Sequence, residues 1–279
     1  MKKYISLLIF SFLVFNLVQS QSRDVRQLGY FDRIQSNGSF EVIIKAGTKE
    51  KVIIEATEGP IDQIKTEVND NTLEIEVENG SWWSSNHFKF KDVKIYITFT
   101  DLKSIVNSGS GTMTLESPIE GNHVSIISSG SGNLYCEDEI TSFGDLRIIN
   151  SGSSKIKINA SVIVDDKTNI INSGSGQLSI AELNADELSI TNSGSGGIEI
   201  SSGRVVSESF ILSGSGGIRA ENMISKKCNI KKSGSGTIHI NVSDELSGSS
   251  SGSGNIYVKG SQPRLDFNFS GSGKIKYVN

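Results

Sequence analysis

Apolar and polar residues alternate along most of the chain, and a Ser-Gly-Ser-Gly tetrapeptide interrupts the alternation at regular intervals. Successive copies begin 18 to 22 residues apart, and the third copy is degenerate, with Ser154 in place of its last glycine. The copies begin at Ser108, Ser129, Ser151, Ser173, Ser193, Ser213, Ser233, Ser251 and Ser270. A period of about 20 residues is typical of one coil of a solenoid.

The alternation keeps the same phase on both sides of each tetrapeptide. The tetrapeptide is followed directly by segments such as QLSI, GIEI, TIHI and NIYV, whose second residue is always apolar. In the segment that precedes the tetrapeptide, the residues five and three positions before its first serine are usually apolar, as at Leu188 and Ile190. A third apolar site follows farther round the coil, as at Ile140 and Leu183. Alternation of this kind predicts strands that bury one face.

One coil cannot bury its apolar face alone, but stacked coils can, with strands pairing in parallel about 4.8 Å apart. The sequence therefore predicts an all-β parallel β-helix, a pectin-lyase-like solenoid, with the tetrapeptide at the corner between two sheets. Glycine suits such a corner because it has no side chain to separate neighbouring coils. The predicted corner glycines are Gly109, Gly111, Gly130, Gly132, Gly174, Gly176, Gly194, Gly196, Gly214, Gly216, Gly234, Gly236, Gly252, Gly254, Gly271 and Gly273. Asparagines just before the corner, such as Asn172, are expected to bond its free amides.

The segment before the repeats keeps the alternation without the tetrapeptide. We divide the chain into a leader (residues 1–20), an N-terminal extension (residues 21–29) and one domain (residues 30–279). Within that domain, residues 30–105 are predicted to form irregular first coils that cap the core, and residues 106–279 form the repeats. A separate small β-domain is the alternative for the first part. The last strand carries Lys274 and Lys276, which discourage stacking of another chain on that end.

The first residues predict export from the cytoplasm. Lys2 and Lys3 precede an apolar run from Ile5 to Val18, which is too short for a membrane span and is typical of a signal peptide cut before Gln21. The mature chain is expected to lack a transmembrane segment and to reside in the periplasm, at the cell surface or outside the cell. Removal of the two lysines changes the net charge from -4 to -6. This balance argues against a nucleic-acid partner.

The sequence offers little catalytic chemistry, and we predict no enzyme, cofactor or metal site. The three histidines lack metal-ligand spacing, and Cys136 and Cys228 fall on inward positions of distant coils, which predicts buried free thiols. Acidic runs at 137–139 and 165–166 leave a carbohydrate-active lyase or hydrolase as an alternative. Trp82 and Trp83 are candidate ligand contacts, although a covering of the core at the capped end is the favoured explanation for them.

The stretches FEVIIKAG and VKIYITFTDLKSIVNSGSG, together with the GSG array and the signal peptide, resemble the putative auto-transporter adhesin, head GIN domain family over residues 30–279. That resemblance implies envelope proteins of Bacteroidota, tight GSG turns between the sheets of a superhelix, and no retained catalytic residues. It favours a non-enzymatic adhesin that recognises glycan or a cell-surface protein through a rigid face. A structural, self-associating envelope component, possible as a homo-oligomer, is a further alternative.

Overall fold

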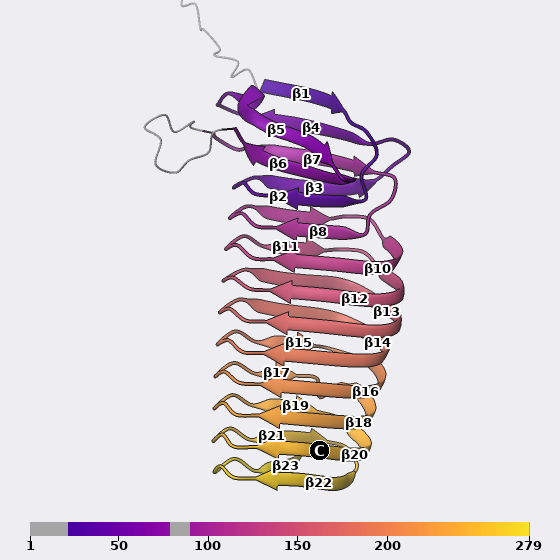
Figure 1. Cartoon of the computed structure of the whole chain (residues 1–279), viewed down its shortest axis with the longest axis vertical. Coiled ribbons are helices and arrows are strands. Elements are labelled where there is room, and N and C mark those ends of the chain that lie inside the picture. The colour runs from indigo at the N-terminus through magenta and orange to yellow at the C-terminus, as the bar shows by residue number, and fades with distance from the viewer. Residues whose placement is uncertain (1–21, 79–89, 279) are drawn as a thin grey trace, which may run out of the picture.

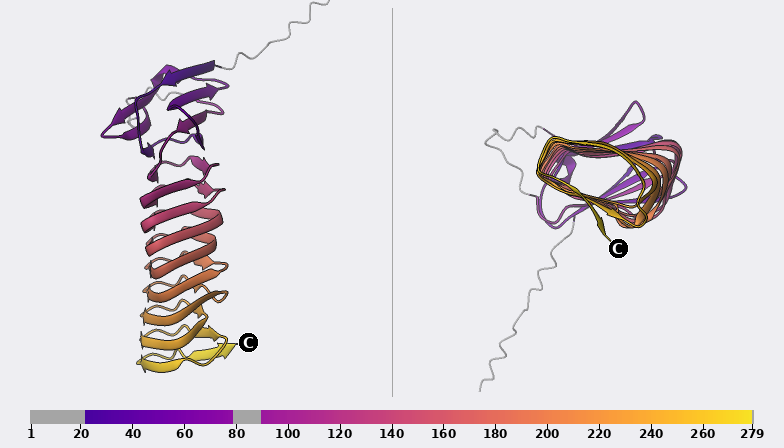
Figure 2. Two further views of the ribbon diagram at one scale, coloured as in Figure 1. Left: turned by 90° about the vertical axis from the view of Figure 1, so that its right-hand side faces the viewer. Right: turned by 90° about the horizontal axis from the view of Figure 1, so that it is seen from below.

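The computed structural model describes residues 22–78 and 90–278, and it shows a tall column of stacked β-coils with an elaborated N-terminal end (Figure 1). In the repeats each coil has a strand that runs into the corner and a strand that leaves it. Seen along the column, successive coils superpose as a flattened loop (Figure 2). The predicted parallel β-helix is confirmed, with coils of about 21 residues.

Strands that run into the corner form one sheet, which we call the entry sheet. They are β2 (Arg33–Ser36), β8 (Ser104–Asn107), β10 (Ile119–Ser128), β12 (Ile140–Asn150), the second half of β13 (Lys155–Asn172) and of β14 (Gln177–Asn192), β16 (Gly203–Leu212), β18 (Met223–Lys232), β20 (Val242–Ser250) and β22 (Arg264–Phe269). Neighbours in this sheet pair in parallel.

Strands that leave the corner form the opposite sheet, which we call the exit sheet. They are β3 (Glu41–Ala46), β9 (Thr112–Leu115), β11 (Leu134–Cys136), the first half of β13 and β14, β15 (Ile198–Ile200), β17 (Ile218–Arg219), β19 (Ile238–Ile240), β21 (Ile256–Lys259) and β23 (Ile275–Val278). The two sheets face each other across the core.

The parallel register places like side chains directly above one another, and these columns form the core. In the entry sheet Ile126, Ile148, Ile170 and Ile190 follow one another in register and are fully buried. In the exit sheet one column runs through Leu134, Ile156, Leu178, Ile198, Ile218, Ile238 and Ile256, each at most 1% exposed. The predicted third apolar sites, including Ile140 and Leu183, are buried as well. The column is therefore continuously apolar along its axis.

The coil formed by β2 and β3 has its own corner, at Gly38. Gly38 lies against Gly109, and a Cβ atom placed on Gly109 would stand 1.9 Å from the Gly38 carbonyl oxygen. Phe40 takes the place that the second glycine of the tetrapeptide occupies in later coils, beside Gly111. Residues 36–40, SNGSF, are therefore a diverged copy of the corner.

The chain order differs from the spatial order at the N-terminal end. Strand β2 lies between β6 (Thr72–Val77) and β8, and β3 lies between β7 (Lys94–Phe99) and β9. The first coil in the sequence is thus the second in the column. The segment between β3 and β8 supplies the strands that lie over it.

Antiparallel strands close the N-terminal end above this coil. Strand β4 (Lys51–Ala56) pairs with β7, β5 (Ile64–Asn69) pairs with β6, and a short 3-10 turn, η1 (Ile61–Gln63), connects β4 to β5. Strand β1 (Ser22–Gln27) pairs antiparallel with β4, so most of the segment assigned to an N-terminal extension belongs to this cap. All of these strands are joined to the column in one continuous sheet, which does not support a separate β-domain.

Candidate ligand-binding face

Corner asparagines and glycines hold neighbouring coils close together. The Asn192 Nδ2 atom donates to the Gly196 carbonyl at 2.9 Å and to the Gly217 carbonyl of the next coil at 3.3 Å, while its Oδ1 accepts from the Gly194 amide at 3.3 Å. Corresponding bonds within the corner are made by Asn107, Asn150 and Asn172. All four side chains are buried. The asparagines therefore satisfy corner groups that the sheets leave free, as the sequence predicts.

Two rows of serine hydroxyls follow the outside of the corner. The first and third residues of each tetrapeptide are exposed, so the hydroxyls recur at the spacing of the coils. Some bond along the axis, as between Ser129 and Ser108 and between Ser215 and Ser195, each at 3.3 Å. The rows are a consequence of the stacked corners, and they present donors and acceptors at a regular interval.

An aliphatic row lies on the outer face of the entry sheet, next to the serines. It consists of the outward residues two positions before each corner, which are Val106, Ile127, Ile149, Ile171, Thr191 and Ile211, and these are register partners from coil to coil. Five are half-buried and Ile211 is 38% exposed. The strand rise places this aliphatic row about 7 Å from the nearer serine row.

The sequence contains a signal for this row that strict alternation hides. The pairs Ile126-Ile127, Ile148-Ile149 and Ile170-Ile171 place two apolar residues side by side on a strand, so one of them must face outward. Sequence reasoning assigned the first of each pair to the core and did not use the second. A recurrent outward isoleucine is the part of the site that the sequence analysis missed.

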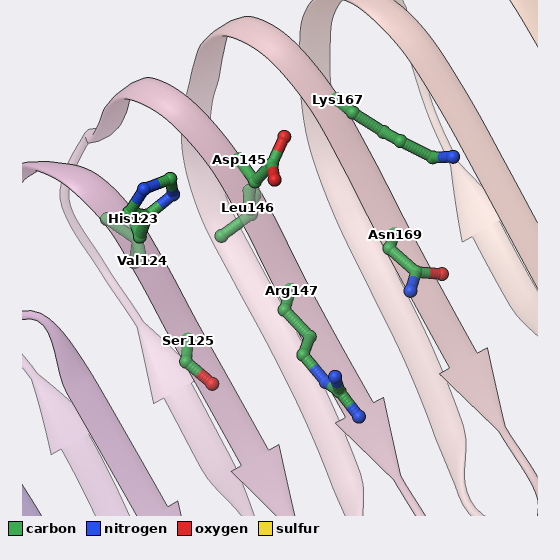
Figure 3. Close-up of a pocket in the computed structure, with 8 residues that line it drawn as sticks. All are labelled: His123, Val124, Ser125, Asp145, Leu146, Arg147, Lys167 and Asn169. Carbon is green, nitrogen blue, oxygen red and sulfur yellow. The ribbon is translucent and has the colours of Figure 1, made fainter.

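Polar residues border the aliphatic row on its other side. An open depression of about 400 Å³ lies among them. It is lined by His123, Val124, Ser125, Asp145, Leu146, Arg147, Lys167 and Asn169, which come from β10, β12 and β13 (Figure 3). Figure 3 shows the Asp145 side chain turned away from the end of Arg147. Among the described residues, Arg147 and Lys167 are in no ion pair. The depression therefore offers Arg147 and Lys167 to an acidic group, with the Asp145 carboxylate on the same lining.

The remaining candidate residues do not gather into a reactive centre. Two members of the first acidic run are bonded to the next coil: Asn159 Nδ2 donates to Glu137 at 2.8 Å and the Ser161 hydroxyl donates to Glu139 at 2.9 Å. Trp82 and Trp83 lie outside the described residues. Within the described ranges there is no cluster of three potential metal ligands and no helix long and apolar enough to cross a membrane.

Both cysteines are buried free thiols, as the sequence predicts. Burial raises the pKa of Cys136 to about 12. Cys228 lies beside Glu208, its register partner in β16, and the Ser225 hydroxyl donates to Glu208 Oε1 at 3.0 Å. Burial raises the pKa of Glu208 to about 7, although the bonds from Cys228 and Ser225 oppose the shift. This polar group is inside the core and has no access to a ligand on the outer face.

A column of parallel coils with a continuous apolar core and glycine corners defines the protein as a β-solenoid. The family model of the putative auto-transporter adhesin, head GIN domain matches residues 30–164 and 144–262, so the chain belongs to that family. No curated protein matches the chain.

Solved structures of similar fold come from Parabacteroides. A putative adhesin from Parabacteroides distasonis is 19% identical with a TM-score of 0.69, over 94% of this chain and 98% of its own. A putative adhesin from Parabacteroides merdae is 20% identical with a TM-score of 0.66, over 93% and 96%. A putative lipid binding protein from Parabacteroides distasonis is 25% identical with a TM-score of 0.68, over 93% and 97%.

Proposed function

We propose that this protein is a non-enzymatic, extracytoplasmic recognition protein that binds a linear polysaccharide along the corner side of its entry sheet. The observation that carries the proposal is the aliphatic row, which has the corner serines on one side and a row of polar residues on the other. A sugar ring has the same division, with apolar C–H faces and polar hydroxyl edges. A polymer of such rings would meet these rows at successive coils from β8 to β16.

The scaffold suits this role because it is already ordered. Each outward residue is fixed by a strand that pairs on both sides, so little side-chain or loop entropy is lost on binding. Membership of the adhesin family supports recognition rather than catalysis. The predicted signal peptide supports a location outside the cytoplasm. The hydrogen bonds that hold Glu137 and Glu139 to the next coil favour this role over a glycosidase.

Arg147 and Lys167 add a preference for acidic polymers to the proposal. Arg147 faces outward next to the aliphatic row, Lys167 faces outward one outward position farther from it than Asn169, and the mature chain is otherwise net acidic. A carboxylate or sulfate on the polymer would bind at this depression by a charge-assisted hydrogen bond. A neutral polymer of the same linkage would bind more weakly, and added salt would reduce that difference.

A glycan array probed with the mature chain tests the proposal, followed by titration with any polysaccharide retained. The double variant Ile149→Ser and Ile171→Ser is expected to weaken binding about tenfold, because apolar contact area is lost. Tyr135→Ser, which also removes an outward apolar residue but on the exit sheet, is the matched control and should leave affinity unchanged. Absence of retention on neutral and acidic glycans, or an equal loss in the control, would contradict the proposal.

A further inference from the structure

The two ends of the column are built differently. Antiparallel strands cover the N-terminal end, whereas the last coil that the structure describes presents two free strand edges. Within the described residues β22 pairs only with β20, and β23 pairs only with β21 (Figure 1). Their backbone N–H and C=O groups on the far edge are available to pair with another strand.

Apolar side chains of the last coil are exposed where those of the preceding coil are buried. Leu265 is 48% exposed and Tyr277 is 41% exposed, although both occupy inward positions. Their register partners one coil earlier, Leu246 and Val258, are 0% exposed. The end of the column is therefore an open cross-section of the core, with an apolar centre and hydrogen-bonding edges on both sides.

The last coil is also complementary to itself. Strand β22 runs toward the corner and β23 runs away from it, with Gly271 between them. A two-fold axis parallel to the strands, about half a strand spacing beyond Gly271 along the column, places β22 of one copy antiparallel to β23 of the other, in continuous sheets. Residues at equal distance from Gly271 then lie opposite each other, which pairs Phe267 with Ile275 of the second copy and Leu265 with Tyr277 of the second copy.

The same register pairs opposite charges on the outer face. Asp266 of one copy lies opposite Lys276 of the other, and the two-fold axis makes this pair twice. Lys276 already points outward, since its ammonium lies 5.8 Å from the Tyr257 ring centroid. Lys276, which discourages stacking of a second β23 on this edge, thus favours the antiparallel β22 instead. Phe269 lies opposite Gly273 of the second copy, where no side chain competes for space.

We propose that two copies of this chain associate end to end through β22 and β23, about a two-fold axis that passes between the two Gly271 residues. The contact buries the exposed apolar residues of both last coils and pairs all four free strand edges. It leaves an N-terminal cap at each far end of a rod of doubled length. The axis keeps both corners on one side, so the serine rows continue across the junction. This inference does not depend on the polysaccharide proposal.

Charge reversal on the outer face tests the contact without altering the core. Sedimentation equilibrium of the mature chain should show a concentration-dependent dimer. Lys276→Glu and Asp266→Lys each place like charges opposite one another twice per dimer, and each should raise the dissociation constant about tenfold or more. The double variant restores opposite charges and should recover the affinity. Lys157→Glu, at the same position of a central coil, is the control and should dimerise as the unaltered chain does.

A covalent trap tests the register directly. The variant Asp266→Cys with Lys276→Cys should give a disulfide-linked dimer under oxidising conditions, whereas each single substitution should not. A strictly monomeric chain up to about 1 mM would overturn the proposal, as would filaments, which indicate head-to-tail stacking. Single charge variants that dimerise as well as the unaltered chain would also overturn it, because the register would then be wrong.

Discussion

Two adjacent glycines of one corner provide a direct test of the stacking. Gly196 and Gly197 follow each other in the chain, and both carry only hydrogen where other residues carry Cβ. A Cβ on Gly196 would stand 1.8 Å from the Gly176 carbonyl oxygen of the preceding coil. A Cβ on Gly197 would find its nearest neighbour, the Gln177 side-chain oxygen, at 3.8 Å. Alanine should therefore be costly at Gly196 and tolerated at Gly197.

The cost at Gly196 follows from how far the coils must separate. Ordinary van der Waals contact begins at 3.4 Å, so the two corners would have to move apart by more than 1 Å. Such a shift strains the bond from the Gly196 amide to the Gly174 carbonyl, which is 3.3 Å long. Overpacking of this kind costs about 1–3 kcal/mol, and a weakened hydrogen bond adds about 1 kcal/mol. Gly197→Ala should change stability by less than about 1 kcal/mol, and chain entropy favours the alanine.

Urea unfolding followed by circular dichroism measures the difference between the two variants. We expect the unfolding midpoint of Gly196→Ala to fall clearly below that of the unaltered chain, with Gly197→Ala at or slightly above it. Melting temperature should follow the same order, with Gly196→Ala lower by about 4–12 °C for a chain of this size. Equal midpoints for the two variants would refute the argument, because they would show that the corners have room for a side chain.

Three further predictions concern buried polar groups. Asn192→Ala should lower the free energy of unfolding by about 1–3 kcal/mol, since corner groups lose partners, whereas Ser193→Ala should not; thermal unfolding compares them. The folded-state pKa of Glu208 is raised to about 7, so its contribution to stability is largest below about pH 4.5 and is lost as pH rises through 7. Glu208→Gln should therefore gain about 3 kcal/mol relative to the unaltered chain between pH 4 and pH 8, measured by urea unfolding at each pH. Cys136 and Cys228 should react with a thiol reagent only after unfolding, because both are buried and burial raises the pKa of each; rapid labelling of native protein would contradict this.

The sequence predicts the repeated part of the fold well because each coil solves the same packing problem. Inward positions such as Ile148 and Ile190 recur at fixed distances from the corner, and the structure buries their apolar residues in every repeat coil except the last. Gly194 and its equivalents recur because a carbonyl of the preceding coil lies where their Cβ would be. Local pattern and tertiary packing agree here, so the pattern is sufficient.

The sequence does not predict which coil lies over which at the N-terminal end. Nothing local in β2 and β3 distinguishes a coil stacked in chain order from one enclosed by strands that come later.

The outward isoleucines were missed for a different reason. Alternation was used to find the core, and a residue such as Ile171, which breaks the alternation, carries information about the surface instead.

The asymmetry of the two ends follows from the way the chain enters the column. Strands β6 and β7 cover the first coil, and β4 and β5, which pair antiparallel with them, end the parallel stacking there. No antiparallel strand follows β22 and β23 among the described residues, so the far edges of these two strands remain open to pairing. At the N-terminal end an antiparallel strand pairs with each sheet and closes the column. In the proposed dimer the second copy supplies the equivalent antiparallel strand to each sheet at the other end.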